Sequence, residues 1–499
     1  MRRALGLVVN YIFAGALALI LLSFFTGGRV TQYGGWLLGI LMLVLAAGLA
    51  ALTWWGYRKF TRSHFLPSLR TEIILVAITM LFYLGISAFV VKFFAVKQSW
   101  DPGELYKLST AVAAGDGLSP DDGYYYYFSA YPFQVFMGYF NGYYLKVMHH
   151  LCDLGDLRLL LLLNAFYVNG AIFFTYLTVR RIFSKKNAMY LLWMVPFFLP
   201  LLLYIPVVYT DTSSLFYLAG AIFFSTLFLR ERRSLKWTSL WAGLFMIFMT
   251  MASLFKVTSA IYLVAVFLYL LLVKKTFRLK KVIVLAVATL AIMLPIRVAV
   301  GAFTDLRVNQ DLEYPKIHWV FMGMYGRGGF NYYPSRLIYD VQQDGGDVSA
   351  TITEEIKKTA QERGVAGFAE LYSNKLSDTW NDGSYYVFDK LSREPLNAES
   401  SVYVFVMNEH QSLLRYVLDV VAISRTILLF VVALMMRKKR DWAAPLKMAL
   451  IGVMLFFLVW ETRSRYILNF LPLFLVLWVY SANALAQCVP AVRLKKNKK

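Results

Sequence analysis

The feature that most limits the fold is the alternation of long apolar stretches with short clusters of Lys and Arg. Apolar residues make up 59% of the 499 residues and charged residues 16%, a balance that soluble domains of this size do not have. The sequence therefore predicts an all-α polytopic membrane protein of about twelve transmembrane helices. The predicted spans are residues 5–25, 36–55, 71–96, 157–179, 188–208, 214–229, 237–255, 257–273, 282–300, 416–435, 445–460 and 466–486.

The basic clusters fix the expected orientation of these spans. The net charge is +22, but the cations lie in short loops at alternate span ends, which is the positive-inside pattern and not a nucleic-acid surface. Both termini are then cytoplasmic in a cell-membrane protein, and the first span, which lacks a cleavage-site pattern, is retained. Cys152 and Cys488 fall on opposite sides, so no disulfide is expected. The clusters are Arg58 to Arg70, Arg180 to Lys186, Arg230 to Lys236, Lys274 to Lys281, Arg437 to Arg440, and the tail from Arg493.

Four regions follow from this topology. Residues 1–70 form an N-terminal hairpin of two spans with a basic loop, and residues 71–300 form a seven-span module whose first outside loop is 97–156. Residues 301–415 carry sixteen acidic against eleven basic residues and form an extracytoplasmic domain, with helices expected at 348–364 and 367–376. Residues 416–499 return to apolar spans and end in the basic tail. Within the first outside loop, the aromatic stretch 131–148 predicts an interfacial helix.

Asp101 is the first residue to which the sequence assigns chemistry. It lies just beyond span 71–96, and the order Asp101, Pro102, Glu104 predicts a helix start with Asp101 as its N-cap. The alternative is that this carboxylate is a base at the membrane surface. Local sequence by itself favours the cap.

Other charges at the outer ends of spans are costly in a membrane and need a reason. Asp211, Lys256 and the group Glu461, Arg463, Arg465 all lie at this depth. Each alone reads as a snorkelling or loop residue. Together they suit a lipid phosphate held by cations while a carboxylate activates a hydroxyl. Asp419 and Arg425, inside span 416–435, could pair or line a groove.

Six short motifs follow one another along the chain: WDPGELY at 100–106, AGDG at 114–117, YPF at 131–133, YTDT at 209–212, LFKVT at 254–258 and SRYIL at 464–468. In this order they resemble the GT-C glycosyltransferases, the superfamily of protein O-mannosyltransferases and lipid A aminoarabinose transferases. The similarity covers residues 71–486, and two further motifs, PKIHW at 315–319 and TWNDG at 379–383, are similar to a subgroup from Gram-positive bacteria.

The resemblance implies that a sugar passes from a polyprenyl-phosphate donor to an envelope acceptor (a polysaccharide, teichoic acid, lipid or protein) on the outer face, with inversion. Asp101 would be the base, assisted by Glu104 or Asp211. No cofactor is certain, and a divalent metal remains open because Pro-Gly-Glu follows the first acid where the family often has an acidic pair. The donor phosphate would be held by Lys256, Arg463, Arg465 and Tyr466, and the substrates by Asp121, Asp122, Tyr131, His318 and Trp380.

A transporter or flippase of a lipid-linked envelope precursor is the alternative. Such a protein places polar groups near the middle of the membrane, on broken spans. Here the charges lie mostly at the outer ends of the spans. The enzyme is therefore the favoured hypothesis.

Overall fold

The computed structural model of the protein describes residues 2–63, 68–152, 154–232, 234–272, 278–435 and 442–488. Regular structure in these ranges is helical, apart from one antiparallel bridge between Val96 and Pro395. The protein is an all-α polytopic membrane protein, as its apolar spacing predicts. Of the predicted basic clusters, Lys274 and Lys275, the run 437–440 and the tail from Arg493 lie outside the described residues.

Ten described helices have the length and composition to cross a membrane, and two shorter apolar helices occupy the other two predicted positions. The short ones are α13 (Ala260–Leu272), preceded by η3 (Val257–Ser259), and α22 (Ala444–Val459). The long ones are α1 (Arg2–Thr26), α3 (Trp36–Arg62), α4 (Leu69–Phe94), α8 (Asp156–Ile182), α9 (Lys185–Met194) with η2 (Val195–Phe198) and α10 (Leu199–Leu203), α11 (Thr210–Arg230), α12 (Leu235–Phe255), α14 (Arg278–Ala288) with the π-helix η4 (Thr289–Met293) and α15 (Leu294–Asp305), α21 (Gln411–Met435), and η7 (Ser464–Phe470) with α23 (Leu471–Cys488).

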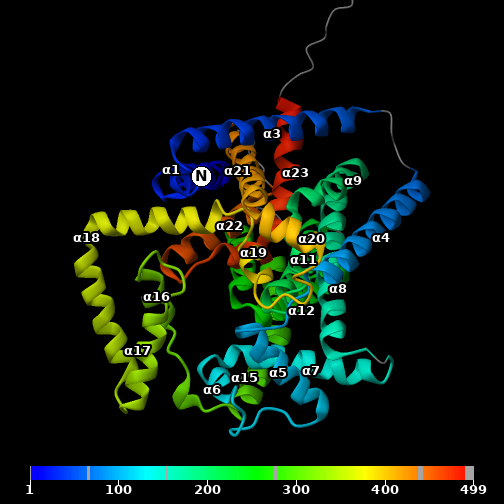
Figure 1. Cartoon of the computed structure of the whole chain (residues 1–499). Coiled ribbons are helices and arrows are strands. Elements are labelled where there is room, and N and C mark those ends of the chain that lie inside the picture. The colour runs from blue at the N-terminus through cyan, green and yellow to red at the C-terminus, as the bar shows by residue number, and fades with distance from the viewer. Residues whose placement is uncertain are drawn as a thin grey trace, which may run out of the picture.

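The helix α23 packs against α8 and α11 inside the bundle, and α11 packs in turn against α12 (Figure 1). The apolar window of the last span, 464–487, is 94% buried, whereas that of 279–305 is only 6% buried. Apolar side chains with no protein neighbour need another apolar medium, so α14 and α15 are expected to face lipid. The close approach of α8 to α11 depends on Gly170, where an added Cβ would lie 2.5 Å from the Phe216 ring.

Two groups of helices lie outside the spans. The first loop forms α5 (Asp101–Ala114), α6 (Tyr125–Ala130), η1 (Pro132–Gln134) and α7 (Val135–His149), so the aromatic stretch 131–148 is helical, as η1 and α7. These helices lie at the end of the molecule opposite α3 in Figure 1. Residues 306–410 form η5 (Gln310–Leu312), α16 (Ile317–Met324), α17 (Tyr332–Gln343), α18 (Val348–Trp380), α19 (Val387–Leu391), α20 (Ser401–Tyr403) and the π-helix η6 (Val404–Glu409).

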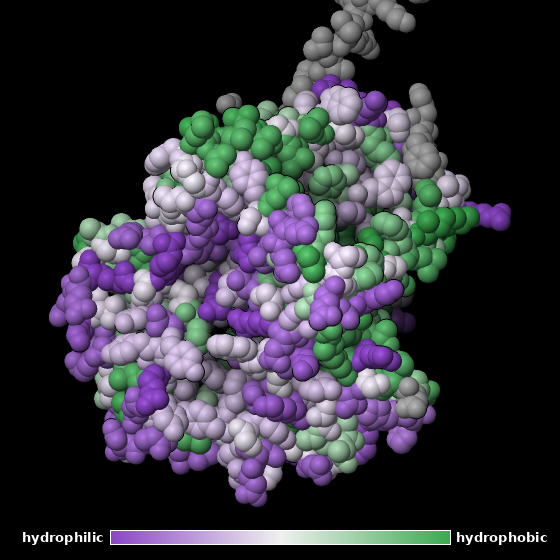
Figure 2. Space-filling model, in the orientation of Figure 1, coloured by the Kyte–Doolittle hydropathy of each residue, from purple (hydrophilic) through white to green (hydrophobic). Residues whose placement is uncertain are grey.

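The long helix α18 is bent at the place where the sequence predicts a break. Gly364 has φ 55°, which a residue with a side chain rarely adopts, and the helix continues on both sides of it. The two arms of α18, with α16 and α17, lie on one side of the bundle, and the surface there is hydrophilic, in contrast to the apolar surface over α1 and α3 (Figure 2). The bend therefore lets one helix border the polar side of the molecule.

A buried polar network joins the N-terminal hairpin to residues 306–410, which we call the polar segment. Arg29, on α2 (Arg29–Gln32) between α1 and α3, donates to Asp419 Oδ2 from Nε at 2.9 Å and from Nη2 at 2.7 Å, and Nη2 lies 3.2 Å from Asp382 Oδ1. Asp419 thus does not pair with Arg425. Arg425 instead donates to the Tyr385 hydroxyl at 2.6 Å and covers the Phe474 ring.

Candidate active site

Asp101 does not cap α5, contrary to the helix-start prediction. Trp100 is the N-cap, with φ 58° and ψ −141° and no side-chain capping bond, and its carbonyl accepts from the amides of Gly103 at 2.8 Å and Glu104 at 3.0 Å. The chain enters the helix one residue earlier than the Asp-Pro pattern indicates because Trp100 takes the non-helical conformation. Asp101 is consequently a first-turn residue whose carboxylate is available for other partners.

Those partners come from two other parts of the chain. The hydroxyl of Tyr209 donates to Asp101 Oδ2 at 3.2 Å, and Arg465 Nη2 lies 3.8 Å from the same oxygen. Gln134 Nε2 in turn donates to the Tyr209 hydroxyl at 2.8 Å, which orients its proton toward Asp101. The Asp101 side chain remains 39% exposed, so it is accessible to a bound molecule while held in place.

Arg465 is buried yet incompletely hydrogen-bonded. Its guanidinium carbon lies 5.0 Å from the Tyr209 ring centroid and 5.2 Å from that of Tyr466, so two aromatic faces hold it. Its Nε and Nη1 atoms have no hydrogen-bond partner among the described residues. Unsatisfied donors on a buried cation are costly, which makes Arg465 well suited to an anionic ligand.

Lys256 and Asp211 form a buried ion pair beside Arg465. Lys256 closes the end of α12, and its ammonium also lies 5.1 Å from the Tyr466 ring centroid. The Tyr466 hydroxyl donates to Glu461 Oε1 at 2.8 Å. Burial raises the pKa of Glu461, and the Tyr466 bond and the arginines at 463 and 465 oppose that rise. These residues, distant in sequence, therefore form one connected polar group.

Other residues predicted for the site have their own side-chain partners outside this group. Arg463 packs against the rings of Phe330 and Tyr386, at 5.2 and 5.1 Å. Glu104 pairs with Lys107 at 2.9 Å.

Asp121 is exposed in the loop before α6, and Asp122 accepts from the Ser119 amide at 2.7 Å. Trp380 is buried against Phe474, with ring centroids 5.9 Å apart. These three residues have structural neighbours, and within the described ranges none of them forms a hydrogen bond or ring contact with Asp101.

Tyr131 and His318 belong to an aromatic cluster next to the site. The Tyr131 ring contacts those of Tyr314 at 5.1 Å and Trp319 at 5.8 Å, and burial, followed by the charge of Asp101, raises its pKa. His318 is fully buried against Tyr314 and Trp319, and neither ring nitrogen has a partner among the described residues. Burial lowers the pKa of His318 to about 4, so this imidazole is neutral.

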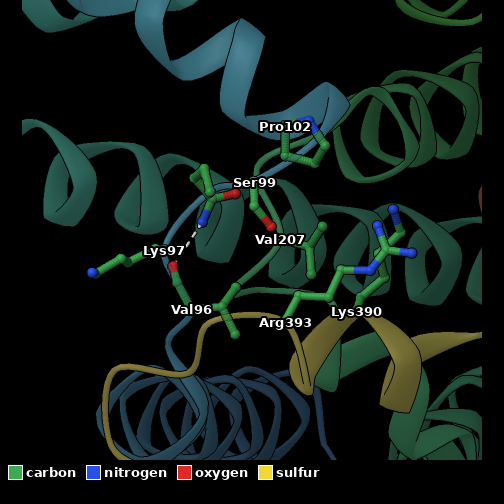
Figure 3. A pocket seen from close by; sticks show the side chains of 8 residues that line it. Val96, Lys97, Ser99, Pro102, Val207, Lys390 and Arg393 are labelled. Carbon is green, nitrogen blue, oxygen red and sulfur yellow. Dashed lines mark hydrogen bonds between the residues drawn. The ribbon is translucent and has the colours of Figure 1, made fainter.

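Sequence reasoning missed three residues near Asp101. Tyr209 belongs to the YTDT motif, but the motif gave no role for its hydroxyl. Lys390 and Arg393 lie among acidic and basic residues of the segment 301–415, where no sequence pattern distinguishes them. Lys390, on α19, and Arg393, just after it, line a pocket with residues 96–99, Pro102 and Val207 (Figure 3). The pocket adjoins Asp101 through Pro102.

No three of His, Cys, Asp and Glu side chains come together in the described ranges in a way that could hold a metal ion. Asp211 is bonded to Lys256 and Glu104 to Lys107, while Asp101 has Tyr209 and Arg465 beside it. The donor set around Asp101 is thus cationic and phenolic, a set suited to an anionic ligand.

A family model described as "Conserved hypothetical integral membrane protein" matches residues 5–486. No curated protein matches the chain. Among solved structures, the chain is similar to the archaeal oligosaccharyltransferase AglB from Archaeoglobus fulgidus, in complex with an inhibitory peptide and a dolichol-phosphate, with 16% sequence identity and a TM-score of 0.44. That alignment covers 84% of this chain and 51% of AglB, so the chain spans about half the length of that protein.

Proposed function

The chain belongs to the family of conserved hypothetical integral membrane proteins, and on that premise we propose that it is a glycosyltransferase using a polyprenyl-phosphate-linked sugar. The observation that carries the proposal is the pair Asp101 and Arg465. A partly exposed carboxylate lies 3.8 Å from a buried guanidinium that has unsatisfied donors. The motif resemblance to GT-C glycosyltransferases supports the same reaction.

Asp101 is assigned the role of general base. An acceptor hydroxyl is a weak nucleophile at neutral pH, and a positioned carboxylate that takes its proton accelerates attack by roughly 10² to 10⁴. The hydrogen bond from Tyr209 fixes one carboxylate oxygen. The other oxygen is then free for the acceptor.

Arg465 is assigned to the leaving group. The acceptor oxygen bonds to the anomeric carbon as the bond from that carbon to the phosphate oxygen breaks, and the lipid phosphate leaves with the electron pair. Because the attack is direct, the anomeric centre inverts. A guanidinium stabilises the departing phosphate by charge and by paired hydrogen bonds.

Lys256 and Asp211 are assigned a supporting role. The two charges neutralise each other. The Lys256 ammonium lies against the Tyr466 ring, and Tyr466 in turn packs against Arg465, so the pair helps to position Arg465. Glu104 stays a prediction as an assisting catalytic residue and Arg463 as a contact of the donor phosphate. The predicted substrate contacts stay predictions as well: Asp121, Asp122, Tyr131, His318 and Trp380. We propose that the active site lies on the extracytoplasmic face and that the acceptors are molecules of the cell envelope.

The test is a transfer assay with radiolabelled polyprenyl-phosphate sugars, supplied one at a time to membranes containing the protein. We expect one donor to lose its label to an acceptor, and Asp101→Asn to lower that rate by about 10² to 10⁴. Stability should be kept, because Asp101 caps no helix. Asp340→Asn, which alters an exposed ion pair with Arg336, is the matched control.

Transfer by purified Asp101→Asn at the wild-type rate would remove Asp101 from the role of base. If no donor is consumed while the labelled lipid crosses the bilayer intact, the protein is a flippase instead.

A further inference from the structure

The pocket beside Asp101 is lined by three basic residues, and no carboxylate residue is among its lining residues. Lys97 comes from the segment between α4 and α5, and Lys390 and Arg393 come from α19 and the turn after it (Figure 3). The ends of Lys390 and Arg393 lie close together, whereas the ammonium of Lys97 points away from them (Figure 3). Two neighbouring basic groups that share no counter-ion are stabilised by an anion. The arrangement is consistent with a site for an anion.

Lys390 differs from the buried lysines Lys375 and Lys256 in the partners of its side-chain nitrogen. The Lys375 ammonium donates to the carbonyls of Gly323, Leu458 and Trp460, at 2.8 to 2.9 Å, and Lys256 pairs with Asp211. Lys390 is 6% exposed, and within the described ranges its ammonium has no hydrogen-bond or ion-pair partner. An amine that is largely withdrawn from water and has no partner loses its charge more easily, and a bound anion stabilises its charged form.

The surroundings of Lys390 include charges of both signs. The pKa of Lys390 is lowered to about 6, first by burial and then by the charges of Arg465 and Arg393, while Asp101 and Asp211 oppose the fall. These groups come from η7, the turn after α19, α5 and α11. The empty site therefore holds a neutral amine at pH 7.5, and a bound phosphate would bring a proton back to it.

Backbone pairing holds the pocket next to Asp101. The Lys97 amide donates to the Glu394 carbonyl at 2.9 Å, and the Leu396 amide donates to the Ala95 carbonyl at 2.9 Å. Arg393 is fixed above the Trp100 ring, 4.8 Å from its centroid. Because Trp100 directly precedes Asp101, a ligand in the pocket lies beside the carboxylate.

We propose that this pocket binds the phosphate of the polyprenyl-linked donor, and that Lys390 and Arg393 are donor-binding residues together with Arg465. The inference rests on the proposed function and names the residues that hold its donor. The sugar of a phosphate bound here would lie on the side of Asp101. Lys390 then pairs with the phosphate and becomes protonated as the donor binds.

The test measures binding to the purified, full-length protein in detergent micelles. The probes are undecaprenyl monophosphate, undecaprenol, which has the same chain without the phosphate, and inorganic phosphate. Variants are Lys390→Met and Lys390→Arg, with Lys357→Met as a control because Lys357 is an exposed lysine of α18 paired with Glu354. Titration calorimetry at pH 7.5 in two buffers of different ionisation enthalpy counts the protons taken up.

We expect Lys390→Met to weaken undecaprenyl monophosphate binding by roughly 10- to 100-fold, the loss of one charged hydrogen bond. Undecaprenol binding should not change, and Lys390→Arg should recover most of the affinity. The wild type and Lys357→Met should take up close to one proton per lipid phosphate bound, and Lys390→Met none. Weak binding of inorganic phosphate with the same Lys390 dependence would show that the site recognises the phosphate itself.

Unchanged affinity and proton uptake in Lys390→Met would overturn the assignment of the pocket. If the wild type and Lys390→Met also transfer sugar with equal KM for the donor, the pocket fails while the proposed glycosyl transfer stands. If Lys390-dependent binding is found but no sugar is transferred, the pocket stands and the proposed reaction fails.

Discussion

His318 shows how burial alone can change what a titratable residue does. Its sequence context suggested a substrate contact, but the imidazole is fully buried among aromatic rings with both nitrogens unpaired in the described structure. The pKa of about 4 lies below the ordinary value of 6.5. In the unfolded chain the ring takes up a proton near pH 6.5, whereas in the folded protein it stays neutral down to about pH 4.

His318 should therefore lower the stability of the folded protein as the pH falls below 6.5. As pH drops from 6.5 toward 4, His318 binds a proton in the unfolded state but stays neutral in the folded state, so the free energy of unfolding decreases. At pH 5 this amounts to about 2 kcal/mol. We expect His318→Phe in detergent to lose less thermal stability between pH 7.5 and pH 5 than the wild type. An equal loss in both proteins would show that His318 is not the group responsible.

At the scale of elements, the N-terminal hairpin is connected to the site through polar contacts. Arg29 on α2 contacts Asp382, whose carboxylate also accepts from the hydroxyls of Ser464 and Ser384. Burial would raise the pKa of Asp382, but Arg29 and the serine bonds hold it below its usual range. Ser464 lies between Arg463 and Arg465 in the chain. The hairpin thus helps to fix the turn that presents Arg465.

Arg29→Met should destabilise the fold and, in the protein that still folds, weaken donor binding. Removing the guanidinium leaves Asp382 and Asp419 buried without their cation, a loss of about 3 to 5 kcal/mol. If the protein still folds, a turn that has lost this anchor should raise the KM for the donor more than it lowers kcat. Arg29→Lys should partly restore the KM.

Arg327→Met is the matched control for the hairpin. Arg327 also joins the hairpin to the polar segment, through the Gly27 carbonyl and Asp378, but among the described residues it forms no hydrogen bond or ion pair with Asp382. A donor KM that rises equally in both variants would indicate a general loosening of the hairpin and no specific role of Arg29.

At the scale of the whole molecule, orientation is the property on which every assigned role depends. The polar segment with α18 must lie outside, and the loop between α8 and α9 must lie in the cytoplasm. A cysteine at Ser349, near the start of α18, should react with an impermeant maleimide in intact cells, in a background lacking Cys152 and Cys488. A cysteine at Ser184 should react only after the membrane is opened. Both positions are exposed, so the opposite pattern would mean the opposite orientation.

Much of the architecture follows from the sequence because it depends on properties that are local along the chain. A run of apolar residues long enough for a bilayer forms a helix whatever surrounds it, since its backbone bonds must be satisfied internally. The twelve predicted positions are accordingly occupied by ten long and two short apolar helices. The break of α18 at Gly364 and the aromatic helix α7 were equally local signals.

The site depended on tertiary structure because its residues are brought together by packing. Asp101, Tyr209, Lys390 and Arg465 come from four distant parts of the chain. The sequence placed Asp101 and Arg465 at the same membrane depth but could not show that they would meet, nor that a backbone twist at Trp100 would free Asp101 from capping α5. No sequence pattern marks Lys390 as a site residue. It comes near Asp101 because the segment after Lys390 pairs with the segment before Asp101, at Pro395 and Val96. Length and hydropathy determine which segments span the membrane, whereas the pairing of charges depends on side-chain contacts that only the folded chain creates.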